Sequence, residues 1–464
     1  MITTIPVQES EVAVMGLGAS GLAAARGLVA SGARVLAWDD CAERRAAARR
    51  AGIRVVELTG VALRGARGLV LSPGIPHTHP APHPVVARAH RESVEIVSDI
   101  ELLARAEPSA RYLGVTGTNG KSTTVALLGQ IFARSGERCA VGGNIGTPAL
   151  GLDSVGDQGL YVLELSSYQL ELTRSLACEV GVLLNISPDH LERHGGLEGY
   201  VRAKARLFEQ MPSGARRTAV IGIDDPHSLR LWRALADDGR FVVVPVSAQR
   251  AVAGGVYADR GRLVDATEGE PVVVADLRPM PGLVGAHNAQ NAAAAYAAAR
   301  AAGAAPASIV EALIAFSGLG HRQELVDVVD GVTFVNDSKA TNGEATAMAL
   351  RRYEEIYWIA GGVPKSTGLG GLESLMHRVR RAFLIGAASE PFAAWLDGKA
   401  PFELCEDLEA AVRRAHARAI AEARPGAAVL LSPACAAHDQ FRSFEARGDA
   451  FAALVEQIAR ERAG

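Results

Sequence analysis

The sequence predicts an α/β fold built from several doubly wound parallel sheets. Short apolar runs that end in a glycine or a polar turn alternate with helical patterns from Glu11 to Leu431, which is typical of strand–helix–strand units. The length of 464 residues is enough for about three domains of ~150 residues each. In such folds ligands gather at the carboxyl ends of the strands, so the turns after each apolar run hold the candidate sites.

The composition excludes several classes of function. Lys and Arg total 48 against 51 Asp and Glu, so no basic field is present that would attract nucleic acid. Five cysteines show no C-x-x-C pair, which argues against a disulfide framework or a zinc site and fits a reducing cytoplasm. The first residues have neither a basic segment nor an apolar core, and no stretch approaches 18 uninterrupted apolar residues. We therefore expect a protein that is neither exported nor membrane-spanning.

The N-terminal stretch carries a nucleotide-binding fingerprint. The run 11–15 ends in G-L-G-A-S-G (16–21), a helical pattern follows to Val29, and the next run, 34–38, ends at Asp39, 18 positions after the last glycine. This pattern is that of a dinucleotide site, so a nicotinamide-dependent dehydrogenase is a serious alternative. The pattern itself supports only the binding of a nucleotide diphosphate at the helix N-terminus. A Rossmann-like unit that binds no ligand, in which the glycines serve only close packing, is a further alternative.

A third apolar run, 68–71, stops at the turn S-P-G-I-P (72–76), and three histidines follow between prolines at 77, 79 and 83. The prolines hold that stretch extended and no acid or cysteine completes a metal site, so we read it as a loop. The segment 98–103, which contains Asp99 and Glu101, then leads toward a domain boundary.

The strongest single signal is the stretch Y-L-G-V-T-G-T-N-G-K-S-T-T (112–124). It reads as strand, glycine-rich turn and helix, in which Gly117 and Gly120 turn backbone N–H groups toward an anion and Lys121 adds a positive charge. Ser122 can then ligate the Mg²⁺ that accompanies a nucleoside triphosphate. Val115 stands where the general phosphate-loop pattern has glycine, so this is a variant loop.

Polar residues follow the next apolar runs. Asn144 lies in the glycine cluster C-A-V-G-G-N-I-G, Glu164 ends the run 160–165, and His190 follows the run 180–184. A carboxylate beside a phosphate loop is a candidate Mg²⁺ ligand, although Glu164 taken alone is better explained as a strand-end cap. His190 on its own reads as structural, and Lys204, in a helical pattern, reads as a surface lysine.

The chain continues with hairpin-like sequence over 252–274 and an alanine-rich helix that ends near Arg300 and carries Asn288 and Asn291 on one face. G-L-G-H-R (318–322) resembles a hinge. Beyond it, runs at 332–335, 356–360, 382–385 and 428–431 predict another doubly wound unit. Cys435 lacks a demonstrable histidine partner, so we expect a packed residue rather than a nucleophile.

Seven motifs that follow one another along nearly the whole chain carry a family resemblance: T-G-T-N-G-K-S-T, G-G-N-I-G, L-E-L-S-S-Y-Q-L, N-I-S-P-D-H, R-A-K-A-R-L-F-E, N-D-S-K-A-T-N and L-S-P-A-C-A-x-x-D-Q-F. In this order they resemble the Mur ligases. The N-terminal S-P-G-I and G-L-G-x-S-G most resemble the members that add D-glutamate to UDP-N-acetylmuramoyl-L-alanine, a cytoplasmic step of peptidoglycan precursor synthesis.

The resemblance implies a Rossmann-like UDP-sugar domain (1–98), a central P-loop-type ATPase domain (99–318) and a C-terminal Rossmann-like amino-acid domain (319–464). It also implies ATP, two Mg²⁺ sites and a CO₂-derived carbamate on Lys204 as cofactors, and a mechanism through an acyl phosphate. Closing of the last domain would then assemble the site.

The resemblance further implies roles for individual residues. ATP would be bound by Thr118, Asn119, Gly120, Lys121, Ser122, Thr123, Thr124, Asn288, Asn291, Arg322 and Asp337. The UDP-substrate would be bound by Gly16, Gly18, Ala19, Ser20, Asp39 (near the uracil), Ser72, Gly74 and Asn144. The first Mg²⁺ would be held by Ser122 and Glu164, and the second by His190 and carbamylated Lys204. Catalysis would depend on Lys121, Asn144, His190, Lys204 and Lys339.

The amino-acid site is where the chain departs from the family pattern. The D-glutamate enzymes often carry a serine after S-P-A-C-A, and this chain has Ala437, followed by His438. Candidates for the amino-acid site are therefore Thr341, Lys365, Ala437, His438 and Phe444. A Mur-type ligase that adds L-glutamate or another amino acid stays open, as does, more remotely, a dehydrogenase or a P-loop switch protein. We expect a monomer that binds neither nucleic acid nor membrane.

Overall fold

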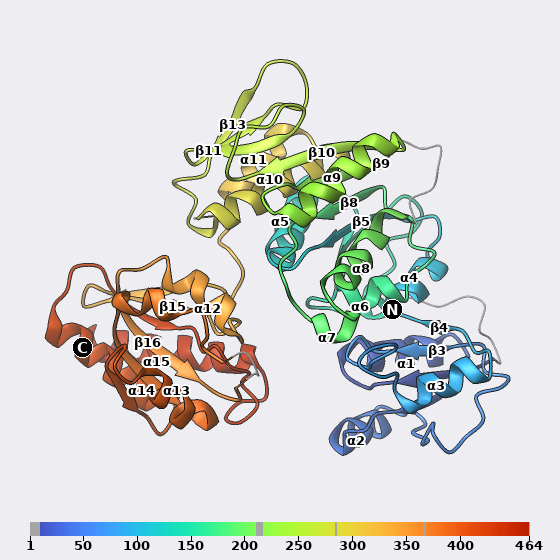
Figure 1. The fold of residues 1–464 in the computed structure, drawn as a ribbon, viewed down its shortest axis with the longest axis horizontal. Helices are drawn as coiled ribbons and strands as arrows, with labels where there is room; N and C mark the ends of the chain where they lie inside the picture. The colour runs from blue at the N-terminus through green and yellow to red at the C-terminus, as the bar shows by residue number, and fades with distance from the viewer. Residues whose placement is uncertain (1–9, 210–216, 284, 365–367, 464) are drawn as a thin grey trace. The chain divides into compact units, whose positions relative to one another are not determined.

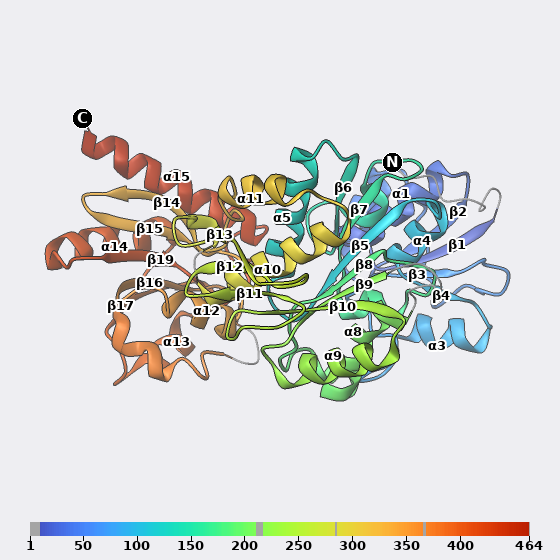
Figure 2. The same cartoon turned by 90° about the horizontal axis from the view of Figure 1, so that it is seen from above.

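The computed structural model describes residues 10–209, 217–283, 285–364 and 368–463 (Figure 1). The chain divides into two compact units, residues 1–317 and 318–464, and each is described by itself. Two sheets lie in the first unit and one in the second, and in each the parallel strands are connected through helices (Figures 1 and 2). The predicted α/β class is therefore confirmed.

The N-terminal sheet has four parallel strands in the order β2-β1-β3-β4. They are β1 (Glu11–Met15), β2 (Arg34–Trp38), β3 (Leu69–Leu71) and β4 (Ile96–Val97). The helices of this region are α1 (Ala19–Ala30), α2 (Ala42–Arg50), α3 (Pro84–Arg91) and α4 (Asp99–Ala106). The first two predicted strands have the predicted bounds, because each is a continuous apolar run bounded by polar residues or glycine.

The central sheet has nine strands in the order β13-β12-β11-β10-β9-β8-β5-β7-β6. From β6 to β11 neighbours run parallel, and β11, β12 and β13 are antiparallel, as the hairpin-like sequence predicts. The strands are β5 (Arg111–Thr116), β6 (Cys139–Gly143), β7 (Leu160–Glu164), β8 (Val180–Leu183), β9 (Arg217–Gly222), β10 (Phe241–Ser247), β11 (Val256–Asp259), β12 (Arg262–Asp265) and β13 (Val272–Asp276).

Helices cover both faces of the central sheet. They are α5 (Lys121–Arg134), α6 (Ser167–Glu171), α7 (Leu191–His194), α8 (Leu197–Glu209), α9 (Pro226–Asp238), α10 (Ala286–Ala301) and α11 (Pro306–Ile314), with short 3₁₀ turns η1 (Ala149–Gly151) and η2 (Pro281–Leu283). Alternate residues of the central strands enter different cores. Leu113 packs with α5 and α10, whereas Tyr112 belongs to a cluster that also contains α1, α4 and α8 residues. The N-terminal and central sheets thus share one hydrophobic cluster.

The second unit contains a six-stranded sheet in the order β14-β15-β19-β16-β17-β18, in which only the β14–β15 hairpin is antiparallel. The strands are β14 (Glu324–Val329), β15 (Val332–Asn336), β16 (Glu355–Gly361), β17 (Val379–Ile385), β18 (Phe402–Leu404) and β19 (Ala427–Leu431). Helices α12 (Gly343–Leu350), α13 (Ser389–Leu396), α14 (Leu408–Glu422) and α15 (Phe444–Ala463) and the turns η3 (Glu373–Arg378) and η4 (Gly386–Ala388) complete it.

Candidate functional site

The predicted phosphate loop connects the end of β5 to the start of α5. Gly120 has a left-handed backbone (φ 87°), and a Cβ placed there would lie 2.1 Å from Oδ1 of Asn291. Only glycine fits that position, because both the backbone angle and the close approach exclude a side chain. The loop N–H groups thus lie next to the first turns of α10, where Asn291 donates to Oδ1 of Asn288 (3.2 Å). The structure therefore brings these two predicted residues to the loop.

Asn185, which follows β8, fixes the loop from the other side. Its backbone carbonyl accepts a hydrogen bond from Thr118 N and its Oδ1 accepts one from Asn119 N, each 2.9 Å long. Its Nδ2 donates to the carbonyl of Asn119 (3.2 Å) and to Oε1 of Gln290 (3.4 Å). The motif reading missed this role. The sequence signal for this role is the position of Asn185, which directly follows the apolar run 180–184.

Lys121 lies over the loop that precedes it. Its Nζ donates to the carbonyls of Gly117 (3.0 Å) and Thr118 (2.9 Å). The ammonium is thereby held against the loop, beside the start of α5, where the first N–H groups of a helix have no intrahelical acceptor. This is the arrangement that an extended polyphosphate requires.

Ser122 and Glu164 are buried beside the loop, and the exposed Asn144 is hydrogen-bonded to Glu164. The Ser122 hydroxyl donates to Oε2 of Glu164 (2.7 Å), and Nδ2 of Asn144 donates to Oε1 (3.0 Å). Parallel pairing of β5, β7 and β6 brings these turns to one edge of the sheet, since Val115 and Gly143 both lie opposite Glu164. Glu164 is 3% exposed. A buried carboxylate with a hydroxyl beside it is a set of hard oxygen donors, the kind that Mg²⁺ prefers.

Lys204 is not a surface lysine. It is 1% exposed, its Nζ donates to the carbonyl of Gly117 (2.8 Å), and it lies 4.4 Å from the ring centroid of Tyr200. Burial, and then the neighbouring charge of Lys121, hold its pKa well below the ordinary lysine value. A neutral amine at this position is a nucleophile, which a lysine on the surface at neutral pH is not.

His190 is less enclosed. Its side chain is 46% exposed, Nε2 lies 3.3 Å from Oδ2 of Asp189, and its ring lies 5.2 Å from that of Tyr168. The residue adopts a left-handed backbone (φ 52°) just before α7. Burial of the ring lowers its pKa, against the opposing charge of Asp189, which favours a neutral imidazole able to act as a ligand.

The predicted diphosphate loop of the N-terminal sheet is held together by its own polar residues. Oδ2 of Asp39 accepts from Leu17 N (2.6 Å), and its Oδ1 accepts from Cys41 N (2.8 Å). The Ser72 hydroxyl donates to the carbonyl of Gly16 (2.9 Å). The structure therefore brings the predicted residues of the β1, β2 and β3 turns together, and the Asp39 carboxylate is engaged in shaping the loop. Gly18 precedes α1, Ala19 and Ser20 form its first turn, and the Gly74 carbonyl accepts from Arg193 (3.0 Å).

In the second unit, Asp337 is buried at the end of β15. Its Oδ2 accepts from the Ser432 hydroxyl (2.7 Å) and its Oδ1 accepts from Gln323 N (3.1 Å). Burial raises the pKa of this carboxyl to about 7, in spite of those hydrogen bonds and of the charge of Arg322. The raised pKa brings the ionisation of Asp337 close to neutral pH.

Other predicted residues of this unit lie in the turns that follow β15 and β19. Lys339 Nζ lies 5.5 Å from the ring centroid of Phe444, and Thr341 N donates to the Lys339 carbonyl (2.8 Å). Ala437 is 2% exposed, whereas His438 is exposed. Lys365 lies outside the described residues.

Sequence reasoning missed Arg447 on α15. This arginine is 1% exposed and donates to Ser338 Oγ (2.9 Å), Ser338 O (2.9 Å) and Cys435 O (3.1 Å). It therefore joins the turns after β15 and β19. Its burial lowers its pKa to about 10.

No group of three or more His, Cys, Asp or Glu side chains in the part of the chain that the structure describes is arranged to hold a metal ion. Among the same residues, no helix is long and apolar enough to cross a membrane.

Comparisons with known proteins agree with the geometry. Residues 115–299 match the family described as the Mur ligase middle domain, and residues 321–435 match the Mur ligase, glutamate ligase domain. The UDP-N-acetylmuramoylalanine--D-glutamate ligase of Rhodospirillum rubrum is 51% identical over 471 residues, which cover 100% of this chain and 98% of that protein. The protein of the same name from Phenylobacterium zucineum is 50% identical, with 98% of each chain covered.

Solved structures show the same fold. The UDP-N-acetylmuramate-alanine ligase MurC of Thermotoga maritima superposes with a TM-score of 0.59 at 17% identity and covers 96% of this chain and 99% of its own. The MurF ligase of Thermotoga maritima in complex with ADP has a TM-score of 0.57 at 19% identity, covering 100% of this chain and 98% of its own.

Proposed function

Because the chain belongs to the Mur ligase family, we propose that it is an ATP-dependent ligase that joins D-glutamate to UDP-N-acetylmuramoyl-L-alanine, a step of peptidoglycan precursor synthesis. The observation that carries this proposal is the end-to-end match, at 51% identity, to a protein named for that reaction. A nicotinamide-dependent dehydrogenase, the more remote alternative, has no such support.

The reaction proposed has two steps. A carboxylate oxygen of the muramoyl-alanine attacks the γ-phosphorus of ATP and ADP leaves, which gives an acyl phosphate. The amine nitrogen of glutamate then attacks the acyl carbon, the carbon–oxygen bond to phosphate breaks, and an amide and inorganic phosphate form. Both steps bring anions together, so the site must supply positive charge and hydrogen-bond donors.

We propose that the loop residues 118–124 bind the phosphates of ATP, with Lys121 nearest the transferred group. The position of the Lys121 ammonium against the loop, at the N-terminus of α5, supports this assignment. Asn288 and Asn291 are proposed to contact the nucleotide from α10, since Asn291 adjoins Gly120. Arg322, Asp337 and Lys339 are proposed to contact the nucleotide or the transferred phosphate from the second unit.

The donors beside the loop fit a Mg²⁺ ion. Ser122 and Glu164 supply hydroxyl and carboxylate oxygens within hydrogen-bond distance of each other (2.7 Å), and both side chains are buried. A bound Mg²⁺ would neutralise phosphate charge there. Asn144, whose side chain Glu164 already orients, is proposed to align the acyl group of the substrate.

The second proposed Mg²⁺ site involves His190 and Lys204. An ammonium cannot bind a cation, whereas the carbamate formed from a neutral amine and CO₂ offers oxygen atoms. The burial of Lys204 and its lowered pKa support that modification, because both favour the neutral amine over the ammonium. His190 would contribute a neutral ring nitrogen.

We further propose that the N-terminal glycine loop binds the UDP moiety. The chain is proposed to form three domains, residues 1–98, 99–318 and 319–464. The separate sheets of the N-terminal and central regions support the first boundary, and the hinge-like G-L-G-H-R supports the second. Thr341, Lys365, Ala437, His438 and Phe444 are proposed to hold the amino acid. The enzyme is proposed to act as a monomer in the cytoplasm, where ATP is present.

The test is phosphate release from ATP with UDP-N-acetylmuramoyl-L-alanine, measured separately with D-Glu, L-Glu, L-Lys, diaminopimelate and L-Ala. We expect stimulation by D-Glu. Stimulation by another amino acid and none by D-Glu would move the chain to another branch of the family. No stimulation by any of them would contradict ligase activity. The comparison matters because Ala437 offers no hydroxyl to the glutamate side chain.

A further inference from the structure

Arg193, on α7, reaches the turn 72–76 that follows β3. Its guanidinium donates hydrogen bonds to three successive carbonyls of that turn, which belong to Pro73 (3.4 Å from Nη2), Gly74 (3.0 Å from Nη1) and Ile75 (3.0 Å from Nη2). Hydrogen bonds from an ionised donor are stronger than those between neutral groups, and the guanidinium fork can donate to several acceptors at once. One side chain therefore holds the turn against the segment that follows β8.

His194, the next residue, fixes α7 to α6. It is buried, and its Nε2 lies 2.9 Å from Ser167 Oγ while its Nδ1 lies 3.0 Å from Oε1 of Glu171. Its ring is stacked on that of Tyr168, with the centroids 5.2 Å apart. Cζ of Arg193 lies 4.5 Å from the centroid of the same tyrosine ring, which is within the range of a cation–π contact. The guanidinium thus extends to the turn from a base on α6.

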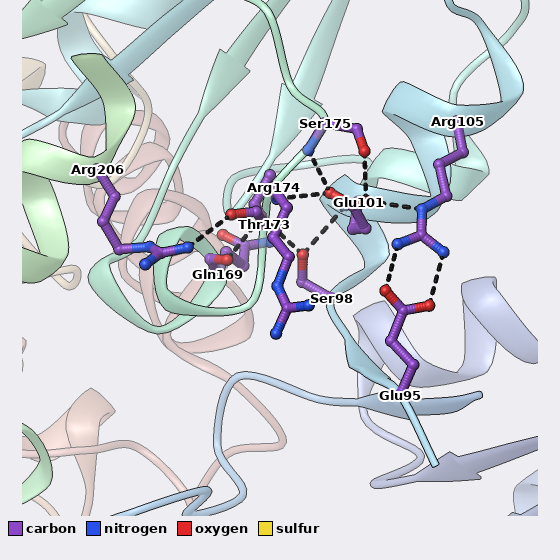
Figure 3. A network of polar contacts seen from close by, with 9 residues as sticks. All are labelled: Glu95, Ser98, Glu101, Arg105, Gln169, Thr173, Arg174, Ser175 and Arg206. Carbon is purple, nitrogen blue, oxygen red and sulfur yellow. Dashed lines mark hydrogen bonds and ion pairs between the residues drawn. The ribbon is translucent and has the colours of Figure 1, made fainter. Parts of the chain in front are cut away.

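The residues of α6 and those that follow it are fixed in turn to α4 and α8 (Figure 3). Glu101, on α4, is fully buried and accepts from N (2.8 Å) and Oγ (2.7 Å) of Ser175. Arg206, on α8, donates to the carbonyls of Leu170 (2.9 Å) and Thr173 (3.1 Å). Because two helices hold this segment, the base from which the guanidinium reaches the turn does not depend on one contact.

Two histidines of the proline-flanked stretch extend the same contact. Nδ1 of His77 lies 3.7 Å from Oε2 of Glu171. Gly195, directly after α7, lies against His79, since a Cβ placed on this glycine would be 2.9 Å from Nε2 of the imidazole. The loop after β3 therefore packs along α7 and α6, and its histidines continue the contact that Arg193 makes.

The turn 72–76 also contacts the N-terminal glycine loop. The Ser72 hydroxyl donates to the carbonyl of Gly16 (2.9 Å), and Ser72 N donates to the carbonyl of Met15 (3.0 Å). The turn is thus bound both to the loop proposed for the UDP moiety and, through Arg193, to the central region that carries the phosphate loop. A substrate that spans both places must be held in one orientation for its acyl group to react.

We propose that Arg193 is a positioning residue for the UDP-substrate, which fixes the turn 72–76 against α7 so that a substrate bound at the glycine loop extends toward the phosphate loop. This inference rests on the proposed function, because it takes the glycine loop as the UDP site. UDP alone occupies only that loop, whose contacts with Ser72 do not involve Arg193. The arginine should therefore matter for the whole substrate and not for UDP.

The experiment is titration calorimetry of the full-length protein with UDP and with UDP-N-acetylmuramoyl-L-alanine, in the absence of ATP and Mg²⁺. We expect Arg193→Ala to bind UDP-N-acetylmuramoyl-L-alanine about 10-fold or more weakly, the size typical for loss of charged hydrogen bonds. Its affinity for UDP should stay within about twofold of the wild type. A general loss of structure would weaken both ligands, so the difference between them identifies positioning.

Arg193→Lys separates the fork from the charge. Lysine keeps the positive charge but lacks the planar fork that holds three carbonyls. We therefore expect this variant to be impaired for UDP-N-acetylmuramoyl-L-alanine nearly as much as Arg193→Ala, again with UDP affinity unchanged. Wild-type affinity in Arg193→Lys would mean that the residue acts by charge alone, which contradicts the proposal.

Tyr168 tests the base of the guanidinium. Tyr168→Phe keeps the ring and should bind both ligands like the wild type, whereas Tyr168→Leu removes the ring and should weaken only UDP-N-acetylmuramoyl-L-alanine. Because the ring acts through Arg193, the double variant Tyr168→Leu/Arg193→Ala should have the affinity of Arg193→Ala and not the product of both effects. Multiplying effects would contradict this link.

Arg206→Ala is the matched control, since it also removes hydrogen bonds from an arginine to backbone carbonyls but none to the turn 72–76. It should lower the thermal unfolding midpoint and leave the ratio of the two affinities unchanged. The proposal is overturned if Arg193→Ala binds UDP-N-acetylmuramoyl-L-alanine within twofold of the wild type, if it weakens UDP equally, or if Arg206→Ala gives the same pattern. If circular dichroism shows that Arg193→Ala is unfolded, Arg193→Lys and the two Tyr168 variants decide.

Phosphate release separates failure of this inference from failure of the proposed function. If the wild type releases no phosphate with any amino acid but Arg193→Ala shows the expected difference between the two ligands, the ligase assignment fails and the positioning role stands. If the wild type is an active ligase and that difference is absent, only the positioning role fails. If the wild type binds UDP-N-acetylmuramoyl-L-alanine no more tightly than UDP, nothing beyond UDP is positioned, and the inference is overturned.

Discussion

Lys121 and Lys204 donate hydrogen bonds to the same carbonyl oxygen, that of Gly117, at distances of 3.0 Å and 2.8 Å respectively. Two amines thus converge on one backbone oxygen, from the first turn of α5 and from the middle of α8. Two ammonium groups this close repel each other, and the more buried one loses its proton more readily. Burial and the charge of Lys121 accordingly lower the pKa of Lys204. The lowered pKa of Lys204 is what its proposed modification by CO₂ requires.

For Lys204, we predict that Lys204→Ala and Lys204→Arg lose nearly all ligase activity, because neither side chain can form a carbamate. Short carboxylic acids added to Lys204→Ala should restore part of the activity by replacing the carbamate oxygens. Phosphate release is the measurement. The exposed Arg202, on the same helix, supplies the control Arg202→Ala, which should keep full activity. Full activity of Lys204→Ala would refute the carbamate.

The buried pair of Ser122 and Glu164 makes a second prediction. Glu164→Gln keeps the shape and one carbonyl oxygen but loses the charge, so we expect kcat to fall about 100-fold or more, the size typical for loss of one electrostatic stabiliser. The Mg²⁺ concentration for half-maximal activity should rise as well. Steady-state kinetics over a Mg²⁺ series would measure both. An unchanged Mg²⁺ dependence would remove Glu164 from the metal site.

Much of the fold follows from the sequence, because buried parallel strands are continuous apolar runs. The bounds of β1 and β2 are those predicted. Strand β17 begins earlier than the predicted run 382–385, at Val379. The additional residues include Arg380 and Arg381, which pair with Glu355 and Glu403 on neighbouring strands. Apolar patterns cannot find charged strand residues whose partners are distant in sequence.

The site could be predicted only in part. The glycine-rich turn between β5 and α5 is a local motif, so the sequence predicts its position, whereas the contacts of Asn185 depend on the order of strands in the sheet. Lys204 illustrates a signal that was overlooked. Tyr200, Ala203 and Leu207 on α8 are buried with it at spacings of three and four residues, so Lys204 lies on the buried face of that helix. The helical periodicity therefore places Lys204 on the buried face of α8, against the interpretation of a surface lysine. The family resemblance also argues against a surface lysine.

Gly120 provides a third prediction. Gly120→Ala would place a Cβ 2.1 Å from Asn291 Oδ1 on a backbone with φ 87°. We expect a loss of ATP affinity of 10-fold or more, measured by titration calorimetry, because the loop must move away from α10. Gly136→Ala is the matched control, since its φ is also positive (72°) but nothing lies within 4 Å of its Cβ. That variant should lose about 1 kcal/mol of stability at unchanged ATP affinity. Equal ATP affinity in both variants would contradict the contact with Asn291.

Asp337 gives the pH prediction. Burial raises its pKa in the folded protein to about 7, from the ordinary aspartate value of 3.8. Below pH ~4 the folded and unfolded states both hold the proton, and Asp337 costs no stability. Between pH 4 and 7 the unfolded state gives up the proton while the folded state keeps it, so the free energy of unfolding falls as the pH rises and levels off above 7. The loss is a few kcal/mol at most, at about 1.4 kcal/mol for each pKa unit.

Asp337→Asn removes that loss, since the amide stays neutral at every pH and its oxygen can still accept from Gln323 N. We therefore expect the thermal unfolding midpoint of the variant, relative to the wild type, to rise from pH 5 to pH 8. Calorimetry of the full-length proteins at pH 5, 6.5 and 8 measures the difference. Asp327→Asn, on β14, replaces an exposed aspartate of the same unit and should show no such trend. A difference in unfolding midpoint between Asp337→Asn and the wild type that stays constant from pH 5 to pH 8 would contradict this prediction. It would mean that the Asp337 carboxyl keeps one charge state throughout that range.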